Sequence, residues 1–162
     1  MRAVHWLFVI SVALFVSGIG FVIAAERTVQ RTPPQANAPV LTAVATVAEI
    51  MSDLVDPAAN AVFKAVGTIV SAQSVEEFAP KNDEEWTALG ARATMLAESG
   101  NLLMMEGRAV DGGDWITMSR ALLDAGAVAA KAAAAKDAKG IYESGAAIYT
   151  TCENCHVRYW RQ

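Results

Sequence analysis

The sequence predicts an all-α domain, an antiparallel four-helix bundle, preceded by an N-terminal apolar helix. Apolar residues recur at three- and four-residue intervals from residue 40 onward, which is the period of an amphipathic helix. Capping residues, prolines and glycines divide this part of the chain into four helical segments, most of them joined by short connections, which favours antiparallel neighbours. The roughly 120 residues of segment 40–162 suffice for the core of such a bundle.

Residues 1–25 form an apolar leader for which two interpretations stay open. The stretch from Trp6 to Ala25 holds 20 uncharged residues, about the length that a helix needs to span a bilayer. A signal peptide cut after Ala24 is the alternative, because small residues precede such a cut. Residues 26–39 contain three prolines and no apolar period, so we expect a tether or a mature N-terminal tail there.

The first helical segment of the bundle is expected from Val40 to about Lys64. Its apolar stripe consists of Val40, Val44, Val47, Met51, Leu54, Ala58 and Val62. The dipeptide Asp56-Pro57 interrupts this stripe, because proline removes a helical hydrogen bond and disfavours the α conformation in the residue before it. We therefore expect a kink or break at Pro57, and a connection with at most one helical turn over residues 67–81.

Three further helices follow. Residues 82–85, Asn-Asp-Glu-Glu, have the form of a capping box, and the second helix is expected from there to about Glu106. Glycines then mark a turn, after which Asp114 can cap a third helix that runs from Trp115 to about Lys136. The fourth helix is expected over residues 141–159.

The end of the fourth helix carries the motif Cys152-Glu153-Asn154-Cys155-His156, which is the attachment signature of a c-type haem. Two thiols three positions apart on a helical turn can each add to a vinyl group of one porphyrin, and the histidine is then held against the iron. Both cysteines of the chain lie in this motif, whereas a structural zinc site needs four Cys or His ligands in paired clusters. The motif therefore predicts one covalent haem c, bound by Cys152 and Cys155 with His156 as a metal ligand.

Haem attachment also predicts where the protein resides. Haem is joined to such thiols on the outer side of the bacterial membrane, so we expect export to the periplasm, with residues 6–25 as an inner-membrane anchor if the leader is not cleaved. The formal net charge of −4 argues against nucleic-acid binding, which needs a basic face.

A four-helix bundle with its haem motif at the end of the fourth helix resembles the class II c-type cytochromes, the cytochrome c′ family with its six-coordinate, low-spin members. The matching stretches are the segment around Ile50-Met51 and residues 145–161, which include Tyr149; residues 83–105 resemble exported relatives of that family. The resemblance implies a haem held between the helices that transfers electrons or binds small gases. It also implies a homodimer through the first two helices.

The sixth iron position is the main open point. The chain has two histidines, and His5 lies in the leader, so a second His ligand from the same chain is excluded. Methionine, lysine or an empty site remain. The resemblance implies that the distal residue comes from the first helix, where low-spin members carry a methionine, and Met51 occupies the matching region. The alternatives are that Met51 is a core residue over an open iron, or that Met104 or Met105 is the ligand.

Two further residue types are candidate haem contacts. Arg158 and Arg161 could pair with haem propionates, because guanidinium matches carboxylate as a two-pronged donor, although solvated charges at a chain end explain them too. Tyr149 precedes His156 by two helical turns and is expected to pack near the porphyrin. We expect a single-electron carrier for a redox partner protein, which could itself be membrane-bound. The alternative is a five-coordinate binder of nitric oxide or carbon monoxide. No spare His is present to move protons, so we expect no enzyme.

Overall fold

The computed structural model describes residues 41–160 and, in the leader, Trp6, Ser11, Val12, Leu14 and Phe15. The chain divides into two compact units, Met1–Val40 and Leu41–Gln162. The predicted leader and the proline-rich tether lie almost entirely outside the described residues. Within the part that is described, no helix combines the length and the apolar character needed to cross a bilayer.

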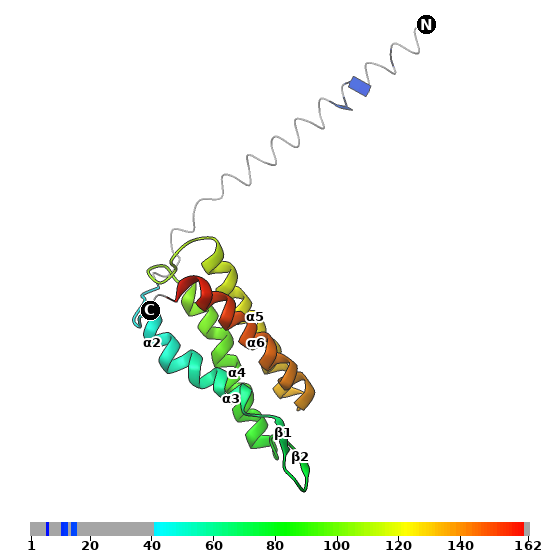
Figure 1. Ribbon diagram of the computed structural model, residues 1–162. Coiled ribbons are helices and arrows are strands. Elements are labelled where there is room, and N and C mark those ends of the chain that lie inside the picture. The colour runs from blue at the N-terminus through cyan, green and yellow to red at the C-terminus, as the bar shows by residue number, and fades with distance from the viewer. Residues whose placement is uncertain (1–5, 7–10, 13, 16–40, 161–162) are drawn as a thin grey trace. The chain divides into compact units, whose positions relative to one another are not determined.

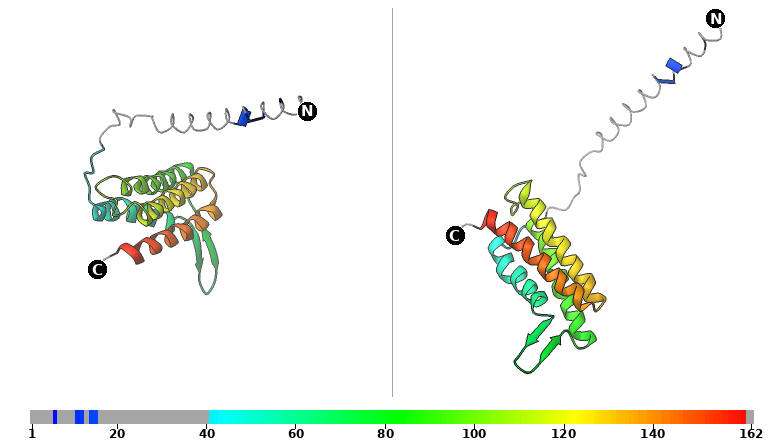
Figure 2. Two further views of the ribbon diagram at one scale, coloured as in Figure 1. Left: turned by 90° about the horizontal axis from the view of Figure 1, so that it is seen from above. Right: turned by 45° about the vertical axis from the view of Figure 1, so that its right-hand side comes forward.

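Residues 41–160 are mostly helical and include one small sheet. The helices are α2 (Val47–Ile50), the π-helix η1 (Met51–Val55), α3 (Asp56–Phe63), α4 (Asp83–Leu103), α5 (Asp114–Ala134) and α6 (Ala138–Tyr159). Helix α4 packs along α5, α5 packs along α6, and α3 contacts both α4 and α6 (Figures 1 and 2). The expectation of a mostly helical domain is therefore confirmed, whereas the purely α class is wrong in one segment.

That segment is a β-hairpin, which projects from the helices beyond α3 (Figure 2). Strands β1 (Gly67–Val70) and β2 (Val75–Phe78) pair antiparallel, with Gly67 opposite Phe78. The β-branched run Thr-Ile-Val and the aromatic Phe78 favour extended backbone. At the tip, the Ser71 N–H donates to the Ser74 carbonyl oxygen at 2.8 Å and closes the turn. The prediction of a connection with at most one helical turn thus missed the two strands, because two runs of four residues are too short to show a strand period.

The first helix begins later than predicted. Residues 41–46 are not helical, and Thr46 caps α2. The Thr46 hydroxyl accepts the Glu49 N–H at 3.2 Å, while the Glu49 carboxylate accepts the Thr46 N–H at 2.8 Å. This reciprocal pair is a capping box, and it fixes the start of the helix at Val47 rather than Val40.

Helices α2, η1 and α3 follow one another without a gap, so Pro57 does not break the helix. Instead, the Asp56 N–H donates to the Met51 carbonyl oxygen, five residues back, and this π-turn lies directly before the proline. Proline is tolerated in the first turn of α3 because it lacks only an N–H that such a turn leaves free. The predicted interruption at Asp56-Pro57 therefore takes the form of one wide turn.

The π-turn changes which residue enters the core. Ile50 is 1% exposed and Val55 is 7% exposed, so these two buried residues are five positions apart. The next buried residues on this face, Ala58 and Val62, follow at the ordinary helical spacings of three and four positions. In a regular α-helix Met51, not Ile50, would lie in line with Val55. The expectation that Met51 lies on the inward stripe is therefore confirmed only in part: Ile50 fills the core, and Met51 is half-buried and packs against its edge.

Helices α4 and α5 approach closely at two glycines. A Cβ added at Gly126 would lie 2.6 Å from the Ala97 backbone nitrogen, and one at Gly100 would lie 2.6 Å from the Ser119 carbonyl oxygen. The start of α5 differs from the prediction, because Gly113, not Asp114, is its N-cap and contributes no side-chain hydrogen bond. Close packing of α4 on α5 supports the loop between these helices and the last turn of α6.

Candidate functional site

The Cys-x-x-Cys-His motif lies in the last turns of α6. Cys152 and Cys155 are free thiols, both half-buried, and Cys152 packs against the edge of the core. At 3.6 residues per turn, positions three apart lie on nearly the same side of the helix, about 4.5 Å apart along its axis. His156, also half-buried, follows directly. Two thiols and one imidazole are thus presented together by a single regular helix.

The thiols are protonated at neutral pH. Burial raises the pKa of Cys152 above its ordinary value of 9.0. Burial also raises the pKa of Cys155, and the nearby charge of a Cys152 thiolate adds to this effect. Reactive Cys-x-x-Cys pairs of redox enzymes have the opposite property, a lowered pKa that favours the thiolate. The environment of this pair therefore does not activate it for disulfide exchange.

Exposed apolar side chains lie along the end of α6 that bears His156. The His156 imidazole packs edge-on against the Trp160 ring, with centroids 4.5 Å apart and an interplanar angle of 79°. Trp160, the C-cap of α6, is 63% exposed, Val157 is 83% exposed, and Tyr149, two turns before His156, is 62% exposed. Large apolar side chains that gather in water mark a surface that another molecule covers. Free thiols, a neighbouring imidazole and this apolar surround are the donor set and environment that fit a covalently bound haem.

The structure gives no support to a zinc site. Among residues 41–160 and the few described leader positions, no group of three or more His, Cys, Asp or Glu side chains could hold a metal ion.

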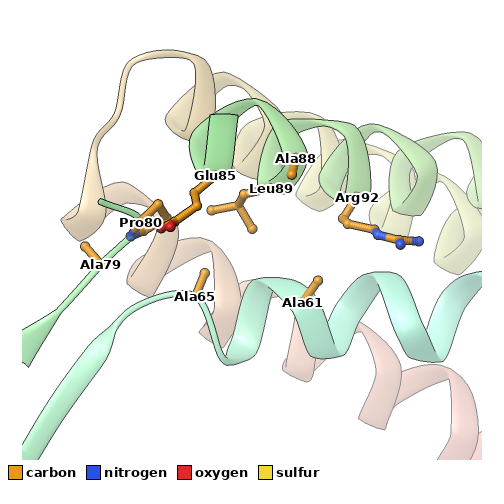
Figure 3. Close-up of a pocket in the computed structure, with 8 residues that line it drawn as sticks. All are labelled: Ala61, Ala65, Ala79, Pro80, Glu85, Ala88, Leu89 and Arg92. Carbon is orange, nitrogen blue, oxygen red and sulfur yellow. The ribbon is translucent and has the colours of Figure 1, made fainter. Parts of the chain in front are cut away.

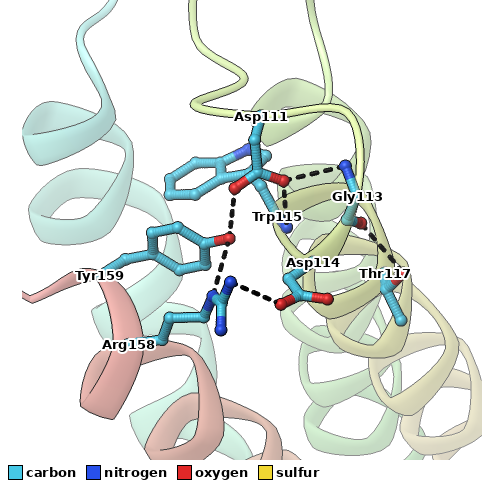
Figure 4. Close-up of polar contacts among 7 residues, drawn as sticks. All are labelled: Asp111, Gly113, Asp114, Trp115, Thr117, Arg158 and Tyr159. Atoms are coloured by element: carbon cyan, nitrogen blue, oxygen red, sulfur yellow. Dashed lines mark hydrogen bonds and ion pairs between the residues drawn. The ribbon is translucent and has the colours of Figure 1, made fainter.

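A polar network ties the last turn of α6 to the loop between α4 and α5 (Figure 4). The Tyr159 hydroxyl donates to Asp111 Oδ2 at 2.5 Å, and Arg158 Nη2 lies 2.7 Å from Asp114 Oδ2. The Tyr159 ring packs edge-on against buried Trp115, with centroids 5.0 Å apart. The hydrogen bond from the Tyr159 hydroxyl has the largest effect in holding the pKa of Asp111 below its usual range, and the hydrogen bonds from the Trp115 and Gly113 backbone N–H groups add to it. The network fixes the end of the helix that bears the motif.

Two segments that carry predicted site residues lie at one end of the domain. The α2–η1 segment with Met51 and the final turns of α6 are found together at that end in Figures 1 and 2. Tyr149 lies on α6 two turns before His156 and is exposed. Arg158 is turned toward Asp114 at the start of α5, so its charge already has a partner, whereas Arg161 lies outside the described residues.

Sequence reasoning missed two polar residues at this end. Asp111 was not singled out, although an aspartate before Gly-Gly is typical of a turn in which the carboxylate accepts backbone N–H groups, as it does here from Gly113 at 2.9 Å. Arg108 was not singled out either, and no sequence pattern distinguishes it from a solvated arginine. It is only 9% exposed.

Two surface cavities lie away from the motif. One, of about 310 Å³, lies between α3, the end of the hairpin and α4, and Ala61, Leu89 and Arg92 are among its lining residues (Figure 3). The other, of about 370 Å³, lies between α4 and α5 beside the Lys136–Asp83 ion pair. Neither is lined by a residue of α6, so neither belongs to the candidate haem site.

Comparisons with known proteins give no relative from which a function could be assigned, so the functional assignment rests on the residues of this chain. A scan against protein-family models, a search of curated proteins and a search of solved structures each gave no match.

Proposed function

We propose that this chain is an exported c-type cytochrome, an antiparallel four-helix bundle of the cytochrome c′ type with one covalent haem. The observation that carries the proposal is the arrangement at the end of α6: two free thiols one turn apart, an imidazole in the next position, and exposed apolar side chains around them. Cys152 and Cys155 hold the haem, and His156 is its proximal ligand.

The raised pKa values suit attachment chemistry. Each thiol adds across one vinyl group: the sulfur bonds to one vinyl carbon, the proton goes to the other, and no oxidant is required. Half-burial of both thiols keeps them protonated and holds them beside the apolar surface that the porphyrin covers. When bound, the haem supplies a one-electron iron couple, and this chain positions and shields it.

Met51 is the proposed sixth ligand. The Met51 side chain is half-buried at the edge of the core, and the α2–η1 segment lies at the same end of the domain as the last turns of α6. A thioether is a soft ligand that raises the reduction potential in His/Met cytochromes. Two protein ligands in both oxidation states keep the geometry nearly constant, which favours rapid electron transfer to a redox partner protein. A membrane anchor and tether at residues 1–39 would keep that transfer close to the membrane.

The test is the oxidised absorption spectrum of the purified holoprotein. Ligation by Met51 predicts a low-spin spectrum with a weak sulfur-to-iron charge-transfer band in the far red, and Met51→Ala abolishes this band. Met118→Ala, which alters another half-buried methionine on α5, is the matched control and leaves the band intact. A high-spin spectrum in the unmodified protein would refute Met51 ligation and favour the five-coordinate binder of nitric oxide or carbon monoxide.

A further inference from the structure

Arg108 lies in the loop between α4 and α5 and is 9% exposed. Its Nε donates to the Ala45 carbonyl oxygen at 2.8 Å, and its Nη1 contacts the Leu102 carbonyl oxygen and the Met105 sulfur, each at 3.1 Å. Nη2 has no hydrogen-bond partner among the described residues. Since no fully buried side-chain nitrogen there lacks a partner, Nη2 reaches the surface. The guanidinium thus has a buried stem and one nitrogen, Nη2, without a partner among the described residues.

The charge of Arg108 is not balanced within the described part of the chain. Three ion pairs are found there, and their cations are Lys136, Lys139 and Arg158. All the acceptors of Arg108 are neutral. Arginine is rarely buried without an anionic partner, because carbonyl oxygens compensate the hydrogen bonds but not the full charge. Nη2 is therefore the atom at which an anion would balance this charge.

The loop that bears Arg108 contacts both segments proposed to flank the haem, the start of α2 and the end of α6. Arg108 itself is bonded to Ala45, directly before the cap of α2, and Asp111 in the same loop is bonded to Tyr159 in the last turn of α6. Figure 4 shows the second of these contacts from the side of α6. The unbalanced cation therefore lies at the end of the domain that carries Met51 and the cysteine motif.

We propose that Arg108 binds the carboxylate of a haem propionate, and this inference rests on the haem proposed above. A carboxylate oxygen accepts a charge-assisted hydrogen bond from a guanidinium nitrogen such as Nη2, and the haem proposed above would bring propionate carboxylates to this chain. The sequence pointed instead to Arg158, but Asp114 already balances that side chain at 2.7 Å. Among the described residues, Arg108 is a buried cation that lacks a counter-charge.

The experiment compares the holoprotein with Arg108→Gln, Arg108→Lys, Arg158→Gln and, as a control on the exposed face of α5, Arg120→Gln. Two readouts are used: the reduction potential and the propionate bending band in the resonance Raman spectrum. We expect Arg108→Gln to lower the potential and shift the band, because a cation near the haem favours the reduced iron. Arg108→Lys keeps the charge and is expected to restore most of the potential. Arg120→Gln leaves both readouts unchanged.

A purely structural role of Arg108 would give lower thermal stability with an unchanged Raman band in both variants, and this result would overturn the inference. A band that shifts in Arg158→Gln but not in either Arg108 variant would also overturn it. If Arg108→Gln is too unstable to purify, Arg108→Lys decides through the band alone. A wild-type protein without covalent haem is a different failure, because it removes the proposed function itself and the inference with it.

Discussion

Ile50→Ala is the substitution that tests the π-turn most sharply, because this turn places Ile50 rather than Met51 in the core. Ile50 is 1% exposed, and the substitution removes three carbons from a packed site. At about 0.8 kcal/mol per buried CH₂ the transfer loss is roughly 2.4 kcal/mol. Adding the cavity left behind, we expect a total of about 3–4 kcal/mol. For a domain of this size the melting temperature then falls by about 10–15 °C.

The assay is urea unfolding of the holoprotein, followed by circular dichroism, with Leu54→Ala as the comparison. Leu54 is half-buried in the same π-turn, so its loss is expected to be about half as large, roughly 1–2 kcal/mol. Ile50→Ala is also expected to leave the far-red charge-transfer band in place, since it does not touch the thioether. A larger loss for Leu54→Ala than for Ile50→Ala would mean a regular α-helix in this segment, and the register argued above would be wrong.

Three further predictions concern packing and ionisation. Gly126→Ala is expected to destabilise the protein by about 1–3 kcal/mol in urea unfolding, because its Cβ would meet the Ala97 backbone. Gly90→Ala, whose Cβ would lie 3.7 Å from the nearest atom, is expected to gain up to about 1 kcal/mol from helix propensity. A Gly90→Ala protein less stable than Gly126→Ala would contradict the packing of α4 on α5. In haem-free protein the pKa values of the two motif thiols lie above the ordinary value of 9.0. The contribution of the neutral thiols to the free energy of unfolding is therefore complete below pH 9 and is lost as the pH rises through the folded-state pKa values. Alkylation of the thiols that is already rapid at pH 7 would contradict this prediction. Tyr159→Phe is expected to raise the lowered pKa of Asp111 toward its ordinary value of 3.8. In acid unfolding, the wild type is then more stable than the variant above pH 3.8, and this difference disappears as the pH falls through the folded-state pKa of Asp111. An equal difference between the two proteins at all pH values would show that the hydroxyl does not act through the carboxylate.

Much of the helical fold could be predicted from local signals. Asn82 begins the second helix because its side chain accepts the Glu85 N–H at 2.9 Å, as the Asn-Asp-Glu-Glu sequence indicates. The end of α6 at Tyr159 agrees with the prediction, whereas α5 ends at Ala134, two residues before the predicted Lys136. These boundaries depend on residues within one or two turns of each other, which is the range over which sequence patterns are informative.

The features that could not be predicted depend on contacts between distant segments or on small register changes. The π-turn moves Ile50 into the core in place of Met51, and a stripe at three- and four-residue intervals does not show such an insertion. The contact between Asp111 and Tyr159 joins residues 48 positions apart. The haem assignment of the cysteine motif rests on five consecutive residues and stays a prediction.

The most direct test of the central proposal is the intact mass of the protein purified from the periplasmic side of expressing cells, measured before and after treatment with a thiol-alkylating reagent. The proposal predicts a chain that carries the mass of one haem and does not react with the reagent, because Cys152 and Cys155 are both in thioether bonds. A colourless chain of unmodified mass that takes up two alkyl groups would contradict it.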